Sequence, residues 1–553
     1  MPDVNVLLIA PPHGERDIYL GLLYVAKVLK DMGCRVRLFD PNKFAREDDS
    51  GDIVIDVNPS VLDEVIRELD VVGISSFKMC APVDRKLVSM VRSRVPGVKF
   101  IAGGWGPTVY PQLYLLYVGV DIVIRGVHMQ ALRTLSNLFS TYLEDLLAGE
   151  FSELRHVRGL VLKCGNELVS TGLEEVPKPC EIPLVDWDLE SYGLDPRDYV
   201  ERGSVLVPVV GALAPCPRYY VSGCVYCSIA RMIKEYREVY GSDFHEVVRR
   251  LTFFDVDRVI KDIENALDYF LALPYVKRVS VVLVDDAVTP KNFRKLFDKL
   301  LETGLIHDIH IVKFQTRPEY AAEIVKYIPE NLRRKFVIDL GVEFFNDSEL
   351  AFTRRGLTSD ELERALEAVS RSGVIWTMYV ILASPITSAR LLRYNLERIL
   401  HYIDYCYLVR VNPYLYEEGT ELVDVVGEDN IATYVLVNED ETVYEVPYRP
   451  RFIANCEELK KVLEVIREFK EEVLRRLIRC SEELRSEVKR VCGDVSKYQE
   501  LIDEGIADAK LVGRVESLKE LLEALLLLED AVKEDIALSE VLREYSRDIQ
   551  ETS

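Results

Sequence analysis

The hydrophobic positions of the first 150 residues follow two alternating patterns. Short apolar runs rich in β-branched residues predict buried strands, and the amphipathic segments between them predict helices. The predicted strands are Val4–Ala10, Arg35–Phe39, Val71–Ser75, Lys99–Ala102 and Asp121–Ile124, and the predicted helices include Gly21–Met32 and Pro82–Val95. This alternation predicts an α/β fold that begins with a Rossmann-like, doubly wound domain over residues 1–145.

A second alternation runs from residue 201 to residue 425. Six strand-like segments are separated by helical patterns, which predicts a partial or full βα barrel. The strand-like segments are Val205–Val210, Arg278–Val284, Ile309–Phe314, Phe336–Val342, Trp376–Ile381 and Tyr407–Val411, with helical patterns at Val256–Leu271, Lys291–Glu302 and Ser359–Ser372. Between the two domains, residues 146–200 predict a hairpin that begins at Gly159–Cys164, followed by a proline-rich linker.

After about residue 430 the pattern changes to long, charged helices. Asn455 and Glu458 form a helix cap signal, and apolar positions at helical spacing follow from Leu459 to Leu477 and again from Val515 to Val532. Residues 426–553 therefore predict a C-terminal helical domain. A helical cap over the barrel mouth explains it more simply than a coiled-coil partner site, because no strict heptad persists.

The charge and composition of the chain argue against several classes of partner and location. The formal net charge of −23 over 553 residues argues against a nucleic-acid or lipid-surface partner, because such attraction needs a basic face. No apolar run approaches the roughly 18–20 residues that span a bilayer. The N-terminal MPDVNVLLIAPP predicts a strand rather than a signal peptide, so we expect a cytoplasmic protein. Glutamine occurs only five times among many charged residues, a skew typical of thermophile chains.

Three of the eleven cysteines are clustered, in the segment CPRYYVSGCVYC that runs from Cys216 to Cys227. The segment follows the first strand of the second domain, where a βα barrel carries its active site. A structural zinc site would need a further ligand, and no second close cysteine pair is present. A redox dithiol would use Cys224 and Cys227 and leave Cys216 unexplained. Three thiolates on one loop favour a four-iron, four-sulfur cluster with one open iron.

With these features the chain resembles the radical S-adenosylmethionine (SAM) enzymes that carry an N-terminal cobalamin-binding domain. Its cysteine spacing departs from the common Cys-x3-Cys-x2-Cys, because seven residues separate Cys216 from Cys224. Further segments resemble family motifs in the same order along residues 1–425. They are Asp70–Ser76, Phe100–Gly104 with Thr108, Asp121–Gly126, Val282–Thr289, Gln315–Arg317, Gly341–Glu343, Thr353–Thr358, Ile381–Pro385, Val411–Pro413 and Glu418–Thr420.

The resemblance implies three cofactors and their contacts. Cys216, Cys224 and Cys227 would be the metal ligands of a [4Fe-4S] cluster. The implied SAM contacts are Tyr226 beside the adenine, Asp285 or Asp286 at the ammonium or ribose, Arg317 at the carboxylate and Glu343 at the ribose. The implied cobalamin contacts are Ser75, Ser76, Gly103, Gly104, Thr108 and Gly126, while the Asp-x-His-x-x-Gly motif of cobalamin mutases is absent.

The resemblance also implies an activity. Such an enzyme would cleave SAM to a 5′-deoxyadenosyl radical and functionalise an unactivated carbon, most simply by cobalamin-dependent methylation. The substrate would be a small molecule or a lipid, and an external donor such as ferredoxin or flavodoxin would supply the electron. Two alternatives stay open. One is formation of a ring or a carbon–carbon bond, for example in a lipid, by an enzyme whose B12 domain has lost its ligand. The other is a non-catalytic metal- or cobalamin-binding regulatory protein.

Overall fold

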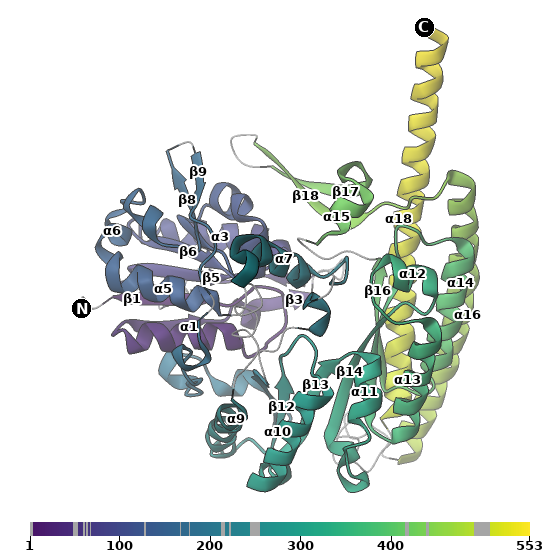
Figure 1. The fold of residues 1–553 in the computed structure, drawn as a ribbon, viewed down its shortest axis with the longest axis horizontal. Coiled ribbons are helices and arrows are strands. Elements are labelled where there is room, and N and C mark those ends of the chain that lie inside the picture. Colours follow the sequence, from purple (N-terminus) through teal and green to yellow (C-terminus); the bar gives the residue numbers. More distant parts are fainter. Residues whose placement is uncertain are drawn as a thin grey trace.

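The computed structural model places two α/β sheets beside each other, with a pair of long helices at the far side of the second sheet (Figure 1). Its description covers residues 4–47, 53–58, 61, 63, 65–66, 68–126, 129–165, 167–175, 177–211, 216–220, 223–243, 255–414, 420–437, 442–491 and 509–552. Within these residues, no helix combines the length and the apolar character that crossing a membrane requires.

Seven of the described strands form the N-terminal sheet, in the order β2-β1-β5-β6-β7-β8-β9. The first five of that order run parallel, and the hairpin β8–β9 extends the sheet antiparallel to β7. The strands are β1 Asn5–Ile9, β2 Arg35–Phe39, β5 Val71–Ser75, β6 Lys99–Gly103, β7 Ile122–Ile124, β8 Leu160–Cys164 and β9 Glu167–Ser170.

Helices cover both faces of this sheet, as the doubly wound prediction requires. Helices α1 (Leu20–Asp31) and α5 (Gln130–Thr141) pack on one face, and α3 (Ala81–Arg92) and the π-helix η3 (Leu113–Val118) pack on the other. Shorter elements are β3 Ala45–Glu47, β4 Ile53–Ile55, α4 Trp105–Val109 and α6 Leu143–Ala148.

The second sheet is a half-barrel of parallel strands, β11 to β16, with the short β10 antiparallel at its first edge. The partial barrel predicted from the sequence is confirmed. Its strands are β10 Val200–Glu201, β11 Ser204–Val209, β12 Arg278–Leu283, β13 Ile309–Thr316, β14 Phe336–Glu343, β15 Ile375–Ala383 and β16 Leu408–Tyr414. Its helices are α7 Ser228–Tyr240, α9 Val256–Leu271, α10 Pro290–Thr303, α11 Pro318–Ile324, α12 Asp347–Phe352, α13 Ser359–Ser372 and α14 Ala389–Tyr402.

The C-terminal region differs from the prediction in two respects. Where only helices were expected, it begins with the short α15 (Leu422–Val426) and a β-hairpin, β17 Ile431–Val437 and β18 Val443–Pro450. The long helices, α16 (Cys456–Val491) and α18 (Lys510–Thr552), lie along helix α14 and strand β16 rather than over the barrel mouth (Figure 1).

Helix α18 covers the open edge of the half-barrel. The edge strand β16 carries backbone N–H groups that would otherwise lack partners in the sheet. Val409 N donates to Ser517 Oγ at 2.9 Å, and Val411 N donates to Glu520 Oε2 at 3.2 Å. The approach requires glycine at position 513, because a Cβ there would lie 1.8 Å from the Tyr407 carbonyl oxygen. The C-terminal helix therefore seals the sheet.

The hairpin β17–β18 joins the two domains. Tyr444 packs edge-on against Tyr117 with ring centroids 5.8 Å apart, and Lys78 Nζ donates to the Pro447 carbonyl at 2.5 Å. A second contact between the domains is the ion pair of Arg125 and Glu235, at 3.4 Å, beyond the end of β7. These contacts hold the carboxyl edge of the N-terminal sheet toward the half-barrel.

The anchor of the hairpin generates a stability prediction. Arg449 is 1% exposed and pairs with Asp535 at 2.9 Å and with Glu534 at 2.7 Å, both on α18. Its replacement removes the nearest cation from the buried Asp535, which keeps the more distant Arg451, at 3.5 Å, and the backbone N of Phe452 as partners. We expect Arg449→Ala to lower the free energy of unfolding by about 3–5 kcal/mol in urea denaturation followed by circular dichroism. The control Arg371→Ala removes an ion pair in which Arg371 is 80% exposed, and it should change the free energy of unfolding by less than about 0.5 kcal/mol. Equal losses in the two variants would contradict the role of Arg449 as an anchor.

Candidate functional site

The three clustered cysteines lie on the loop between β11 and α7. Cys216 and Cys224 are buried and Cys227 is half-buried. Cys227 N donates to the Cys224 carbonyl at 3.0 Å, and Cys227 immediately precedes α7. Gly223 has φ +66°, and a Cβ there would lie 2.5 Å from the Ala230 Cβ, so only glycine allows this turn. Among the described residues, no three His, Cys, Asp or Glu side chains are arranged to hold a single metal ion.

Two guanidinium groups lie beside the cysteine sulfurs. Burial raises the pKa of the Cys216 thiol; Arg317 and Arg355 oppose that rise, and Cys224 adds to it. Arg355 Nη1 lies 3.9 Å from the Cys224 sulfur. Cations close to thiols favour the thiolate form, which is the form that ligates iron. The donor set and its surroundings therefore fit an anionic iron–sulfur cluster.

Arg317 follows strand β13 and is 3% exposed. Its Nη2 donates to the Arg355 carbonyl at 2.6 Å, and its Nε pairs with Glu319. Its Nη1 is buried and has no hydrogen-bond partner within the described part of the chain. An unused guanidinium donor in a buried position is suited to a carboxylate ligand, the group that the sequence assigns to Arg317.

Glu343 ends strand β14 in an unusual backbone conformation. Its φ of 66° lies in the left-handed region, and the register between β14 and β15 shifts between Gly341 and Glu343. Such bulges redirect side chains and are over-represented beside active sites. Burial raises the pKa of the Glu343 carboxyl, and Arg355 and Tyr226 oppose the rise. The structure thus brings Glu343 and Tyr226 together next to the cysteine loop.

Arg355 is a site residue that the sequence reasoning did not assign. It is 7% exposed, and its Nη2 donates to the Gly341 carbonyl. Its segment also supports the cysteine loop, because Val225 N donates to the Thr353 carbonyl at 3.2 Å and Arg218 donates to the Arg354 carbonyl at 2.9 Å. The segment Thr353–Thr358 resembles a family motif, and Arg355 directly precedes its glycine, Gly356. This position in the motif is the sequence signal that could have identified Arg355.

The two aspartates after β12 are placed differently. Asp285 is 8% exposed, and its carboxylate lies so close to Gly211 that a Cβ on that glycine would be 2.3 Å from Asp285 Oδ2. Gly211 lies just beyond β11, so Asp285 borders the cysteine loop. Asp286 is half-buried at the same strand end. Of the two aspartates, Asp285 is therefore the one placed against the start of the cysteine loop. No contact among the described residues identifies a ligand for either aspartate.

The N-terminal domain contains an apolar cavity of about 220 Å³ between the sheet and helices α1 and α5. Four of the residues that the sequence assigned to cobalamin line it, namely Ser75, Gly103, Gly104 and Gly126. Gly104 has φ +93°, and a Cβ there would lie 3.1 Å from both Ser75 Oγ and Ser76 N. The glycines therefore keep the cavity open at the carboxyl edge, where doubly wound sheets bind their ligands.

The other two assigned residues, Ser76 and Thr108, are not among those that line this cavity. Ser76 Oγ bonds to the Tyr114 hydroxyl at 2.8 Å and also donates to the Asp84 carboxylate. Thr108 is 0% exposed, and its Oγ1 accepts from Gly126 N at 3.3 Å. Both hydroxyls thus form hydrogen bonds within the protein. We infer that Ser76 and Thr108 stabilise the loops that carry Gly104 and Gly126.

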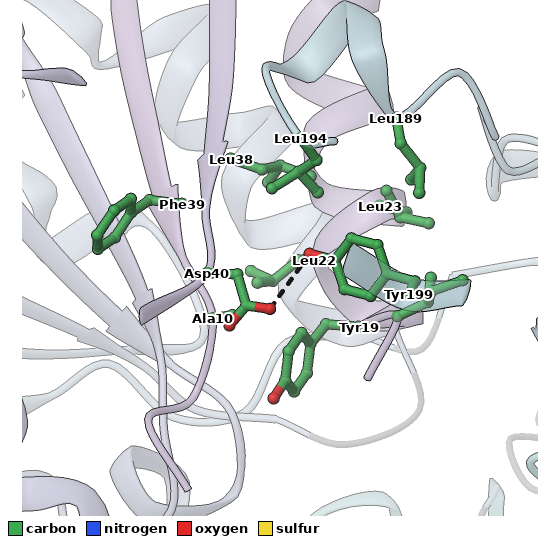
Figure 2. Close-up of a pocket in the computed structure, with 11 residues that line it drawn as sticks. Ala10, Tyr19, Leu22, Leu23, Leu38, Phe39, Asp40, Leu189, Leu194 and Tyr199 are labelled. Carbon is green, nitrogen blue, oxygen red and sulfur yellow. Dashed lines mark hydrogen bonds between the residues drawn. The ribbon is translucent and has the colours of Figure 1, made fainter. Parts of the chain in front are cut away.

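A smaller cavity lies nearby, between α1, the end of β2 and the linker (Figure 2). Its volume of about 20 Å³ holds at most a single water. Tyr199 of the linker donates to Asp40 Oδ2 at 3.2 Å across it. Burial raises the pKa of the Asp40 carboxyl, and hydrogen bonds from Asn42 and Tyr199 oppose the rise. The hydrogen bond between Tyr199 and Asp40 therefore attaches the linker to the N-terminal domain. The cavity itself is too small for a cofactor.

Asp84, buried below Ser76, generates a pH prediction. Burial raises its pKa to about 8, and the hydrogen bond from Ser76 opposes the rise. Between the ordinary pKa of an aspartate and about 8, the folded state holds a proton that the unfolded chain has released. Stability therefore falls as pH rises, by at most about 1.4 kcal/mol per pH unit.

We expect Asp84→Asn to melt at a higher temperature than the wild type, by a margin that grows from about pH 5 to about pH 8. Differential scanning calorimetry at both pH values measures the margin. The exposed control Asp530→Asn, at a side chain 73% exposed, should show no such growth. A constant margin for Asp84→Asn would contradict the buried, protonated carboxyl.

Comparisons with known proteins agree with this geometry. Residues 18–136 match the family model of the B12 binding domain. The structure is similar to that of the cobalamin-dependent SAM radical enzyme OxsB with aqua-cobalamin and SAM bound, with a TM-score of 0.60 and 14% identity over 100% of this chain and 81% of that chain. It is also similar to the radical SAM methyltransferase TsrM from Kitasatospora setae with cobalamin and a [4Fe-4S] cluster bound, with a TM-score of 0.55 and 13% identity over 81% of this chain and 82% of that one.

No curated protein matches the sequence. The structural similarities therefore support the fold of the chain, and the family-model match supports a B12 binding domain at residues 18–136. Together they confirm the α/β fold class, with its doubly wound domain, its half-barrel and its helical C-terminus. The chain has a B12 binding domain and the fold of cobalamin-dependent radical SAM enzymes, as the motifs of its sequence indicated.

Proposed function

We propose that this protein is a radical SAM enzyme that methylates an unactivated carbon of a small molecule or a lipid, with cobalamin as the methyl carrier. The observation that carries the proposal is the meeting, at the carboxyl edge of the half-barrel, of two buried cysteines with a buried arginine that has an unused donor. An enzyme of this class needs a metal cluster and a carboxylate-bearing cofactor side by side, and this arrangement is suited to both.

Cys216, Cys224 and Cys227 would hold the cluster, and Arg317 and Arg355 would balance its negative charge. When bound, the cluster and SAM supply a radical that removes a hydrogen atom from the substrate, and methylcobalamin supplies the methyl group. The role of the half-barrel is to orient these groups and to exclude water from them. The burial of Cys216, Cys224 and Arg317 supports that role.

The SAM contacts follow from the same strand ends. Arg317 Nη1 would bind the carboxylate, because a guanidinium offers paired donors to a carboxylate. Glu343, held beside Arg355 and Tyr226, would accept hydrogen bonds from the ribose hydroxyls. Asp285, against the backbone of Gly211, would face the ammonium group. Tyr226 would lie beside the adenine, where an aromatic ring can stack.

The cavity of the N-terminal domain supports cobalamin binding. Its walls come from apolar residues of the sheet, α1 and α5, and its rim is formed by Ser75 and the three glycines. An apolar cavity of about 220 Å³ with a polar rim is suited to a flat aromatic group linked to a phosphate, which is the chemistry of the nucleotide tail of cobalamin. This observation favours a functional B12 domain over one that has lost its ligand.

Substitution of the cysteines tests the cluster. Anaerobic reconstitution of the wild type should give about four irons and four sulfides per chain, and reduction with dithionite should yield 5′-deoxyadenosine from SAM. The triple variant C216A/C224A/C227A should lose the iron and all product. The control C34A/C164A/C180A removes three cysteines outside the site and should retain both. Stoichiometric zinc in place of iron, without SAM cleavage, would overturn the proposal.

A glycine substitution tests the cobalamin cavity. A Cβ at Gly103 would meet no heavy atom within 4 Å, so Gly103→Val leaves the fold intact and places methyl groups in the cavity. We expect the affinity for hydroxocobalamin, measured by visible absorption in a binding titration, to fall by about tenfold or more. The matched control Gly97→Val has equal space but lies on an exposed turn, and it should bind as the wild type does. Equal affinity of the two variants would exclude this cavity as the binding site.

A further inference from the structure

The outer surface of the half-barrel has a groove between helices α10 and α11, with a volume of about 590 Å³. The two helices follow neighbouring strands, β12 and β13, and lie side by side (Figure 1). Because each helix starts where its strand ends, the upper end of the groove lies at the carboxyl edge of the sheet. That edge carries the cysteine loop and Arg317.

The upper end of the groove is basic, in a chain of net charge −23. Lys291, Arg294 and Lys295 line it from the first turns of α10, and all three are exposed. Within the described residues, Lys291 and Lys295 have no ion-pair partner. The lining carboxylates are Asp298, whose Oδ2 lies 3.8 Å from Arg294 Nε, and Glu323 near the end of α11, so the positive charge is concentrated at Lys291 and Lys295. The positive potential of the three basic side chains would attract an acidic partner.

The groove also carries aromatic side chains. Tyr327, just beyond the end of α11, lies under the Arg294 guanidinium, with 5.5 Å between the guanidinium and the ring centroid, and Tyr320 lines the groove from the first turn of α11. Tyrosine and arginine are the residues that most often anchor protein–protein interfaces. A surface that combines them with unpaired lysines is better suited to a protein than to a small anion.

Tyr320 connects the groove to the cysteine loop. Its backbone N donates to the Arg317 carbonyl at 3.1 Å. Burial raises the pKa of its phenol, and the charged groups that act on it include Arg317, Cys216 and Arg218. The first turn of α11 therefore carries Tyr320 of the groove and begins directly after Arg317. Since Cys216 and Cys224 are buried, an electron donor has to approach through a surface of this kind.

We propose that this groove docks a small acidic electron-carrier protein that reduces the cluster. The inference rests on the proposed function, and it adds the surface that the expected electron donor uses. One electron leaves the reduced carrier, which becomes oxidised by one electron, and enters the cluster. That electron is consumed when the carbon–sulfur bond of SAM breaks to give methionine and a deoxyadenosyl radical, so one electron from the carrier balances this cleavage step.

The test compares two sources of electrons. In K291E/R294E/K295E, formation of 5′-deoxyadenosine driven by reduced flavodoxin should fall by about tenfold or more at low ionic strength. The rate driven by dithionite, which needs no docking surface, should stay within about twofold of the wild-type rate. The affinity for oxidised flavodoxin, measured by calorimetry on the same variant, should fall in parallel. Salt of about 0.5 M should reduce the flavodoxin-driven rate of the wild type, because it screens exposed charges.

A matched variant makes the same change of net charge elsewhere. K460E/K519E/R371E reverses three exposed cations, two on the C-terminal helices and one on α13, and should accept electrons from flavodoxin as the wild type does. Equal losses in the two variants, or an unchanged flavodoxin rate in the groove variant, would overturn the docking surface. A loss of the dithionite rate in the groove variant would also overturn it, because the groove residues would then act on the cluster site. Failure of the proposed function differs from all of these, since the wild type itself would form no deoxyadenosine with dithionite.

Discussion

The buried guanidinium of Arg355 is the group on which the candidate site depends. A charge removed from water must find partners in the protein, and this one finds them on several strand ends. It donates to the Gly341 carbonyl on β14, lies beside the Cys224 sulfur after β11, and faces the Glu343 carboxylate. Its own carbonyl accepts from Arg317 after β13. One buried cation thus fixes the relative positions of the loops that would hold cluster and SAM.

Much of the fold follows from the hydrophobic pattern. Arg35–Phe39, Val71–Ser75 and Val256–Leu271 agree with the structure to the residue. The edge strand Arg35–Phe39 alternates between exposed and buried positions, the inner strand Val71–Ser75 is an apolar run, and Val256–Leu271 has an amphipathic helical pattern. The hairpin β17–β18 was missed. The sequence between its strands contains no glycine, and its side chains Tyr434 and Tyr444 pack with the core of the distant N-terminal domain. A pattern that is read locally does not contain that contact.

The candidate site was predictable in part, for reasons that differ from residue to residue. The cysteines and Arg317 were identifiable because their spacing and their positions after strands carry chemistry. Ser75 and Ser76 looked equivalent in the sequence, although adjacent residues of an extended segment point to opposite faces. Ser75 lines the cavity, whereas Ser76 points to Asp84 and Tyr114. Arg355 was not assigned, although it lies in the motif Thr353–Thr358, because its role comes from contacts with groups on other strands, which the sequence does not contain.

The contacts between the domains explain why two separate sheets can serve one reaction. The Lys78 contact to Pro447 and the Arg125 pair with Glu235 both start from loops at the carboxyl edge of the N-terminal sheet. Glu235 belongs to α7, the helix that Cys227 precedes. The edge with the glycine-rimmed cavity is thereby held toward the cysteine loop. Parallel strands gather their ligand-binding loops at one edge, so these contacts place the ligand-binding loops of the two sheets near each other. The proposed methyl transfer to a substrate radical would need the two cofactor sites to face each other in this way.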